Sequence, residues 1–556
     1  MSDPAFSAFS VAGFMQLTTR KANSPVGKFP DQQEYWPTKL RVSVAPHKAN
    51  QNTGHGKYPK KAFKYITPSI ISSFVCSQRN QFNMGKYIIK NAYVISIDRN
   101  IGNVSDCDVI IEDDTIKAVG QNLQYSDHTV IDGTDAIVSP GFVDTHRHTW
   151  QAQTRTVATD YVLVDYFVNL RNVYGSSYGP NDAYLGNLCG ALESIDSGTT
   201  YIVDHSHIQN SPEHSDAAVQ GLKDSKIRAV FCYALYKNPW WPGSTLDKKR
   251  EEETPNWRIE DARRVRQNCF QSNKAEDLLR FGFVPGEPDL TPFDELCDNL
   301  QKGREMGAAL TTLHTAFGKH DSGSRYTLQL KDRGLLGPDI LLSHCNSLTD
   351  EEIEAVREYK VGVSATPDTE LQMGMDHPIG FKLTDRGCRC GLGVDVCCST
   401  SADMFHQMRL QLQTQRHLEH HSVSGIPHKI SRNCYDVLEM ATMGGARAVG
   451  LDHLIGSITP GKKADLILTR CDSPGLVPVH DHVGALVQYA RPSDIDTVFV
   501  NGELLKHEYK LVHVDWPKIR KELRDSTKGI MKRAAKAPAD ELVAAGNTFK
   551  QYFISK

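Results

Sequence analysis

The residues of this sequence best suited to chemistry stand at the ends of short apolar runs. His146 and His148 close SPGFVDTHRH, His314 lies in ALTTLHTA, and Asp395 closes CGLGVD. Side chains at alternate positions of a strand share a face, so the first two histidines can point the same way. Imidazole nitrogens and a carboxylate oxygen are typical ligands of a divalent transition metal, zinc above all. The four residues therefore predict a site for one divalent ion, zinc first and iron second, with a position left open for water.

The same residues have plainer interpretations that the sequence must outweigh. A single His-x-His pattern is common on half-exposed strands, and a histidine at a strand end is often only hydrogen-bonded. Four donor residues spread over three separate runs are much harder to obtain by chance, which favours the metal. His205 and His207 in TTYIVDHSH alternate in the same way. They could share one face and line a pocket, with Asp204 facing away, or they could simply form hydrogen bonds within a loop.

The elements that carry these residues alternate between apolar strand-like runs and amphipathic helical stretches, of which PNDAYLGNLCGALESIDSG is one. Eight strands alternating with helices predict a (β/α)₈ barrel, an α/β fold of the TIM type. In such barrels the functional side chains gather at the carboxyl ends of the strands, which is where the histidines fall. The eight runs are GFVDTHRH, TTYIVDHSH, RAVFCYALY, RFGFVP, ALTTLHTA, DILLSHC, VGVSATP and CGLGVD.

The flanks of the barrel segment differ from it. Residues 84–139 and 456–514 are short, β-rich and punctuated by turn residues, which predicts one small β-sandwich built from both chain ends. The barrel would then occupy residues 140–455, and residues 515–556 would form a charged, helical C-terminal tail. Residues 1–83 hold 11 Lys or Arg against three acids and show no sustained period. They predict a basic, disordered extension.

Composition narrows the class of protein. The chain has 556 residues and a net charge of -3, which argues against a nucleic-acid partner, and no apolar run is long enough to cross a membrane. The 13 cysteines are odd in number and lack CxxC pairs, the usage of a reducing compartment. We expect a cytoplasmic protein. A flexible extension, or a start codon assigned too early, is favoured over a transit peptide at the N-terminus, and mitochondrial targeting stays open.

Several motifs resemble those of the amidohydrolase superfamily. PGFVDTHRH is similar to its first-strand motif, and LLSHCNSLTDEEI, GLGVDVCCST and ATMGGARAVGLDHLIGSITPGKKADLIL are similar to its later landmarks. The resemblance runs from about residue 84 to residue 514 and is strongest to the branch of cytosine deaminase and the triazine (atrazine-type) chlorohydrolases and deaminases. It implies a metal-bearing (β/α)₈ barrel with a small β-sandwich made from both chain ends. It leaves a homo-oligomer open.

The resemblance also implies roles for particular residues. His146 and His148 match the first two metal ligands, His314 the third and Asp395 the fourth. In the family this aspartate also takes the proton from metal-bound water. His344 in LLSHC matches the histidine that polarises the substrate and steadies the attacking hydroxide. Asp395 and His344 are thus the expected catalytic residues.

One residue departs from the family pattern. In the deaminase branch the third ligand begins an HxxE motif whose glutamate carries a proton to the leaving nitrogen, but here the motif reads His-Thr-Ala-Phe and ends in Phe317. Glu370, after the seventh run, could point into the barrel mouth as a replacement, or could lie in the first turn of a following helix. The loss also raises an alternative reaction class, a metal-dependent lyase or decarboxylase of the same superfamily, which has no need of that glutamate.

The segment after the first run is expected to shape the substrate pocket. Trp150 and Gln151 follow the predicted ligands directly, and aromatic residues in such loops suit a flat cyclic substrate. We therefore predict Trp150, Gln151, His207 and Glu370 as substrate-binding residues. The predicted activity is hydrolysis of a carbon–nitrogen bond other than a peptide bond, or loss of a related leaving group, in a small heteroaromatic molecule.

Overall fold

The computed structural model describes residues 85–270 and 272–538. The predicted basic extension, residues 1–83, lies outside these ranges, as do the last residues of the predicted helical tail. The boundaries predicted for the segments stay predictions. The description below concerns the compact unit to which the described residues belong.

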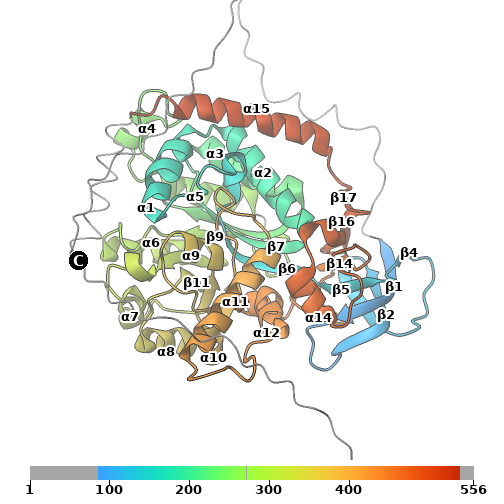
Figure 1. Ribbon diagram of the computed structural model, residues 1–556. Helices are drawn as coiled ribbons and strands as arrows, with labels where there is room; N and C mark the ends of the chain where they lie inside the picture. The colour runs from blue at the N-terminus through green and yellow to red at the C-terminus, as the bar shows by residue number, and fades with distance from the viewer. Residues whose placement is uncertain (1–84, 271, 539–556) are drawn as a thin grey trace, which may run out of the picture. The chain divides into compact units, whose positions relative to one another are not determined.

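Eight parallel strands close into a barrel, in the order β10-β11-β12-β13-β6-β7-β8-β9 (Figure 1). The predicted (β/α)₈ barrel is confirmed, and each of the eight predicted runs supplies one strand. Almost every residue of these strands is buried, because helices cover the outside of the barrel and side chains fill its interior. The strands are β6 (Phe142–Arg147), β7 (Thr199–Ser206), β8 (Arg228–Ala234), β9 (Leu279–Val284), β10 (Thr311–Thr315), β11 (Ile340–His344), β12 (Gly362–Ala365) and β13 (Arg389–Leu392).

Helices connect successive strands, and their ends carry ordinary sequence signals. Pro180 opens α2 at its first turn, and Thr349 with Glu352 forms a reciprocal capping box at the start of α8. The helices around the barrel are α2 (Pro180–Asp196), α3 (Pro212–Ser225), α4 (Lys248–Glu253), α5 (Trp257–Cys269), α6 (Phe293–Glu305), α7 (Tyr326–Asp332), α8 (Asp350–Glu358), α9 (Pro367–Gln372), α10 (Gly380–Asp385), α11 (Met404–Ser422), α12 (Cys434–Glu439) and α13 (Gly445–Ala448).

The two β-rich flanks meet in a second, nine-stranded sheet, in which β5 pairs antiparallel with β14 from Ala136↔Arg470 to Pro140↔Leu466. Blue and red strands therefore lie side by side in Figure 1. Asn501 and Gly502, both at positive φ, make the tight turn between β15 and β16, as an Asn-Gly pair commonly does. The strands are β1 (Lys86–Ile95), β2 (Asn103–Glu112), β3 (Thr115–Gly120), β4 (Thr129–Asp132), β5 (Ala136–Pro140), β14 (Leu466–Arg470), β15 (Ile495–Val500), β16 (Glu503–His507) and β17 (Lys510–Leu511).

The segment that follows β6 is held in place by close packing against α2. It forms a short 3₁₀ helix, η2 (Thr149–Thr154). A Cβ atom at Gly186 would lie 2.3 Å from the carbonyl oxygen of Trp150, and one at Gly190 would lie 2.3 Å from that of Thr149. Only glycine allows this approach. The fold thus fixes the backbone that carries Trp150 and Gln151.

A long C-terminal helix, α15 (Trp516–Ala534), runs across α2 (Figure 1). Ser526 donates a hydrogen bond to Asp182 of α2 and accepts one from Gln153 of η2, at 2.6 and 3.1 Å. Arg533 forms an ion pair with the same aspartate. The helix therefore braces α2 and η2, the two elements behind the segment that follows β6.

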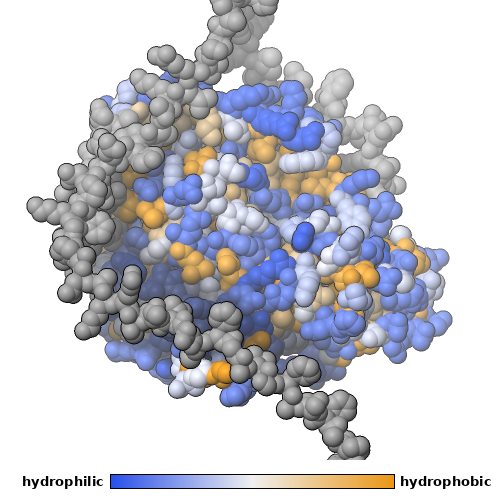
Figure 2. Space-filling view, viewed as in Figure 1, coloured by the Kyte–Doolittle hydropathy of each residue, from blue (hydrophilic) through white to orange (hydrophobic). Residues whose placement is uncertain are grey.

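The described residues combine a mixed surface (Figure 2) with a buried apolar core. Figure 2 shows hydrophilic side chains interspersed with hydrophobic ones over the face in view. Within residues 85–270 and 272–538, no helix has both the length and the apolar character needed to span a membrane. The cysteines of these ranges are all free thiols, and most are buried.

Candidate metal centre and the residues around it

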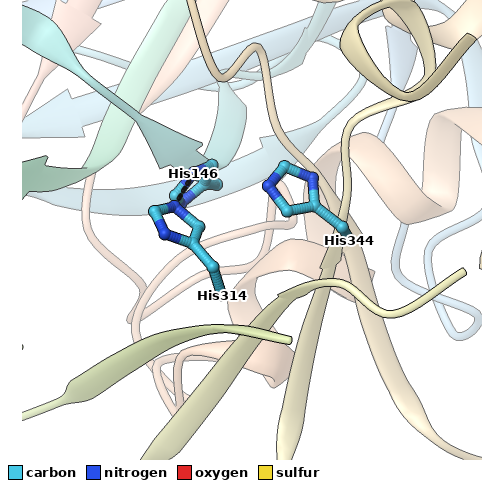
Figure 3. Close-up of side chains that lie close together, drawn as sticks. All are labelled: His146, His314 and His344. Atoms are coloured by element: carbon cyan, nitrogen blue, oxygen red, sulfur yellow. Dashed lines mark hydrogen bonds between the residues drawn. The ribbon is translucent and has the colours of Figure 1, made fainter. Parts of the chain in front are cut away.

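The fold brings the predicted ligands together at the carboxyl ends of the barrel strands. His146 lies in β6, His314 in β10 and His344 at the end of β11 (Figure 3), and all three point toward one another. His148 follows β6, and Asp395 follows β13. All five side chains are buried. Two overlapping donor groups result, one of His146, His148 and Asp395 and one of His146, His314 and His344, each with its donor atoms within 4.8 Å.

The Nε2 atoms of His146 and His148 lie close to Asp395, and that of His314 lies close to His146. Asp395 Oδ1 lies 3.2 Å from Nε2 of His146 and 3.3 Å from Nε2 of His148. His314 Nε2 lies 3.1 Å from His146 Nε2. Three imidazoles and one carboxylate therefore lie around His146 Nε2, and their sharing of one ion stays a prediction.

The other ring nitrogen of each of these histidines is occupied on the far side. His148 Nδ1 lies 2.8 Å from the carbonyl oxygen of His205, and His314 Nδ1 lies 2.6 Å from Glu287 Oε1. His146 Nδ1 lies 3.0 Å from the hydroxyl of Ser343. Partners of this kind fix the ring orientation and the tautomer of a metal-binding histidine.

The hydrogen-bond chemistry fits a bound cation. A carbonyl oxygen only accepts, so His148 must carry its proton on Nδ1 and present a lone pair from Nε2 toward the carboxylate of Asp395. Burial holds the pKa values of His146 and His148 well below their usual range, so neither ring is expected to supply the missing positive charge. The residues present therefore suit a divalent ion at the centre.

Two of these residues lie in a strained backbone conformation. His344 has φ +73° and Asp395 has φ +65°, a left-handed region that residues with a Cβ atom seldom adopt. Such conformations cost of order 1–3 kcal/mol and cluster at functional sites. Here they turn two side chains from the strand ends into the barrel mouth.

His344 and Glu370 form a small network beside the centre. His344 Nδ1 lies 2.9 Å from the hydroxyl of Thr366 and 3.8 Å from Glu370 Oε1. Burial opposes protonation of His344, but the carboxylates of Glu370 and Asp395 outweigh it and raise the pKa. Glu370 Oε1 accepts a hydrogen bond from the backbone N–H of Thr366, while Oε2 is buried without a partner among the described residues. Glu370 thus lies in the first turn of α9 and behind His344.

The other predicted pocket residues lie on the β7 side. Trp150 donates through Nε1 to His207 Nδ1 at 3.0 Å, and the ring of His207 stacks on that of His148 at 4.1 Å. Gln151 donates to the hydroxyl of Tyr166 at 2.6 Å, and its Oε1 has no partner in the part of the chain that is described. Trp150 and Gln151 are fully buried, and His207 is nearly so. Their places beside the donor group leave the predicted substrate contacts open as predictions.

Three residues near the centre were not predicted. Glu287 follows β9, Tyr236 follows β8, and Arg171 lies in η3 (Tyr166–Tyr174), a π-helical segment that continues from α1 (Leu163–Asp165). Glu287 is reached through Gly286, whose φ of +136° turns the chain back toward the barrel axis. A charged residue shortly after a barrel strand is the signal that could have identified Glu287.

Phe317 occupies the place where the HxxE glutamate was expected. Its ring lies 5.5 Å from that of His344 and 6.1 Å from that of His314, centroid to centroid. The position therefore faces the centre but offers only an apolar ring. Glu287 brings a carboxylate to His314 from a different strand end, and burial raises its pKa to about 8.

His205 packs against the ring of His314. Its ring stacks on that of His314 at 4.2 Å, and its Nδ1 lies 3.1 Å from the hydroxyl of Thr312. Its Nε2 is buried and has no hydrogen-bond partner within the described ranges. Asp204 faces the other way, as the alternation predicted, and accepts hydrogen bonds from Asn187 and from the backbone of Thr149.

Comparison with known proteins agrees with this architecture. Residues 137–505 match the model of the amidohydrolase family. A 5'-deoxyadenosine deaminase of Methanosarcina mazei is 29% identical over 472 residues, which cover 84% of this chain and 100% of the relative. A 5-methylthioadenosine/S-adenosylhomocysteine deaminase of Thermoanaerobacter pseudethanolicus is 25% identical over 80% of this chain and 99% of its own.

Solved structures share the fold. An adenosine deaminase from Xanthomonas campestris with bound zinc aligns with a TM-score of 0.69 and 21% identity, over 81% of this chain and 99% of its own. A triazine hydrolase from Arthrobacter aurescens aligns with a TM-score of 0.69 and 20% identity, over 80% of this chain and 99% of its own. The family match spans well over half of the chain, and the barrel with its buried histidine and aspartate donors agrees with it. The chain belongs to the amidohydrolase family and is a metal-dependent hydrolase of that family.

Proposed function

We propose that this protein is a hydrolytic deaminase of a small nitrogen heterocycle of the adenine type. In the reaction, water adds to a ring carbon that bears an amino group, the carbon–nitrogen bond breaks, and ammonia leaves. The approach of His146 and His148 Nε2 to Asp395, with His314 Nε2 beside that of His146, carries the proposal. The printed activities of the similar deaminases support the choice of leaving group.

We propose that His146, His148, His314 and Asp395 hold one divalent ion, zinc first and iron second. Such an ion supplies Lewis acidity that activates water at neutral pH. The free Nε2 lone pairs and the buried carboxylate support this assignment. Zinc is favoured because imidazole and carboxylate donors suit it and because it is bound in a similar structure.

Asp395 and His344 are the proposed catalytic residues. The carboxylate of Asp395 can accept the proton that the attacking water loses, because it is itself one of the proposed ligands and lies beside the position left open for water. His344, with its pKa raised, can donate a hydrogen bond to the ring nitrogen on which negative charge develops. Trp150, Gln151 and His207 would form the adjoining wall, and Glu370 would hold His344 through Thr366.

A lyase or decarboxylase is the weaker alternative. It arose only from Phe317, and the relatives found are named as deaminases. Without the family glutamate, another carboxylate must carry the proton to the leaving nitrogen. Besides Asp395, Glu287 lies beside His314 and Glu370 lies beside His344.

Three further expectations concern the partners, the location and the assembly of the protein. We propose a small-molecule substrate without a nucleic-acid partner, a cytoplasmic location supported by the free cysteines, and assembly as a homo-oligomer as a further possibility. None of these affects the chemistry of the site.

The test is metal content combined with ammonia release. Full-length protein is loaded with zinc, assayed for zinc per chain, and offered adenosine, 5'-deoxyadenosine, methylthioadenosine and aminotriazines. About one zinc per chain with ammonia release from at least one amine is the expected result. Zinc binding without release from any amine would contradict the deaminase assignment, and failure to bind any divalent ion would contradict the ligand set.

A further inference from the structure

A buried arginine lies beside the donor group and takes no part in the chemistry proposed above. Arg171 belongs to η3 and is only 4% exposed. Burying a guanidinium costs free energy unless a carboxylate or enough hydrogen-bond acceptors compensate it. The question is therefore what compensates Arg171.

Among the described residues, only one of the three guanidinium nitrogens of Arg171 forms hydrogen bonds. Nη1 donates to the carbonyl oxygen of His207 at 3.3 Å and to Asn238 Oδ1 at 3.2 Å. Nε and Nη2 make no hydrogen bond within residues 85–270 and 272–538, and neither is a fully enclosed atom. These two N–H groups form the side-on edge of the guanidinium, the edge that binds a carboxylate through two parallel hydrogen bonds.

No acidic side chain completes this edge. Among the described residues, no carboxylate oxygen lies within 4.0 Å of a guanidinium nitrogen of Arg171, the distance that defines an ion pair. Burial lowers the pKa of Arg171 to about 10, and Tyr166 and Glu287 counter that only from a distance. Among the described residues, the ring face of Tyr236 offsets part of this positive charge, but no carboxylate in contact neutralises it.

Arg171 lies close to two of the proposed metal ligands. The guanidinium lies over the ring of Tyr236 with its Cζ 4.8 Å from the ring centroid, and the hydroxyl of Tyr236 lies 3.4 Å from His314 Nδ1. On the other side, Arg171 binds the backbone of His207, whose ring stacks on His148. One side chain thus separates Arg171 from each of two proposed ligands.

We propose that Arg171 is a specificity-determining residue that binds a carboxylate on the substrate through its Nε and Nη2 edge, above the ring of Tyr236. The substrate class is then an aminated heterocycle with a carboxylate-bearing substituent. The heterocycle lies at the donor group and the substituent extends toward η3. This inference rests on the proposed function for the identity of the heterocycle, and on Arg171 alone for the carboxylate.

The competing account is that Arg171 only braces His207 and Asn238. A brace would affect every ligand equally, whereas a carboxylate receptor affects anionic ligands selectively. A matched ligand pair separates the two accounts. Carboxymethyl-adenine and its neutral carboxamide share the ring, the amino group and nearly the same shape, and differ in the charge that Arg171 would meet.

Binding of each compound to full-length, zinc-loaded protein is measured by titration calorimetry, and ammonia release is followed separately. The wild type should bind the carboxylate about tenfold or more tightly than the carboxamide, since hydrogen bonds to charged groups are the strong ones. Arg171→Gln should abolish this preference, and Arg171→Lys should retain part of it. Asn238→Ala keeps the charge, removes one brace contact, and should keep the preference.

Two results would overturn the inference. One is wild-type protein that does not prefer the carboxylate, and the other is an Arg171→Gln variant that, while folded by circular dichroism, keeps the preference or loses affinity equally for both compounds. A preserved preference without ammonia release from either compound would remove the deaminase proposal and leave the role of Arg171 in place. The calorimetric and the catalytic readouts thus distinguish the two failures.

Discussion

Two buried arginines at opposite ends of the barrel have very different hydrogen-bond and ion-pair partners. Arg228 opens β8, away from the barrel mouth, and binds Asp465 through Nε at 2.7 Å and Nη2 at 3.2 Å. Its Nη2 also donates to Asn501 at 2.6 Å. Arg171, near the mouth, has a carbonyl and an amide as partners and an unused edge. One guanidinium is fully compensated by the protein, and the other is not.

The difference separates structural from functional burial of charge. Asp465 immediately precedes β14, so its pair with Arg228 joins the barrel to the nine-stranded sheet. A buried pair of this kind is complete within the fold. At the mouth, the lone pairs of His148 and Asp395 face one another, and Arg171 has no carboxylate partner among the described residues. On the proposals above, a metal ion and a substrate carboxylate complete these groups, so the mouth would serve a ligand and the opposite end stability.

The largest expected effect is at Asp395. Asp395→Asn removes a ligand charge and the proposed proton acceptor, and should lower kcat/KM by about 10²–10⁴-fold or more. Ammonia release by zinc-loaded protein measures it. The matched control is Asp465→Asn at the opposite end, which should destabilise the fold but leave kcat/KM per folded molecule close to that of the wild type. Equal catalytic losses in the two variants would contradict the division between the two ends.

The second effect concerns stability. Arg228→Met leaves Asp465 buried without its cation and should lower the free energy of unfolding by about 3–5 kcal/mol. Arg171→Met leaves behind no buried carboxylate within 4.0 Å, so its free energy of unfolding should stay within about 1 kcal/mol of the wild type. Urea unfolding of the two variants side by side measures both. A large loss in Arg171→Met would make this arginine a structural brace.

Most of the fold could be predicted from the sequence pattern, for a physical reason. Barrel strands are buried on both faces and read as continuous apolar runs, so the eight strands could be predicted. The proposed ligands stand out in the sequence because they end those runs. Pairing over long separations is not visible. Arg228 and Asp465 lie 237 residues apart, and nothing local to either indicates the other.

The parts of the site that the sequence did not predict depend on turns rather than runs. The fourth predicted run stopped at Pro285, and the next residue, Gly286, makes the turn that directs Glu287 inward. Arg171 lies in a segment predicted only as an aromatic loop, and its unpaired edge is a property of three-dimensional contacts. Phe317 was correctly identified from the motif as a departure, because the spacing from His314 fixes its place beside the donor group.

A smaller effect is expected on metal affinity. Glu287 Oε1 lies 2.6 Å from His314 Nδ1, which would donate to it once Nε2 binds a metal, and removing such a partner typically weakens metal binding about 10- to 100-fold. Glu287→Ala should therefore weaken zinc binding by this factor, measured by competition with a chromophoric chelator. Glu287→Gln retains an acceptor oxygen and should weaken zinc binding less. If ammonia release nonetheless falls steeply in Glu287→Gln, this carboxyl also replaces the proton carrier lost at Phe317.

The smallest effects should come from the neutral partners of the two arginines. Asn501 has φ +52°, so Asn501→Gly removes its side chain without straining the turn. Arg228 then keeps both bonds to Asp465, and the loss of unfolding free energy should be about 1 kcal/mol. Asn238→Ala leaves Arg171 with a single carbonyl acceptor and should cost more, about 1.5–3 kcal/mol. Both variants keep Arg171 and its free edge, so carboxymethyl-adenine should raise the unfolding free energy of each by an amount that reflects its affinity. If carboxymethyl-adenine stabilises the wild type and both variants no more than its neutral carboxamide does, the charge of Arg171 at the mouth is not what binds it.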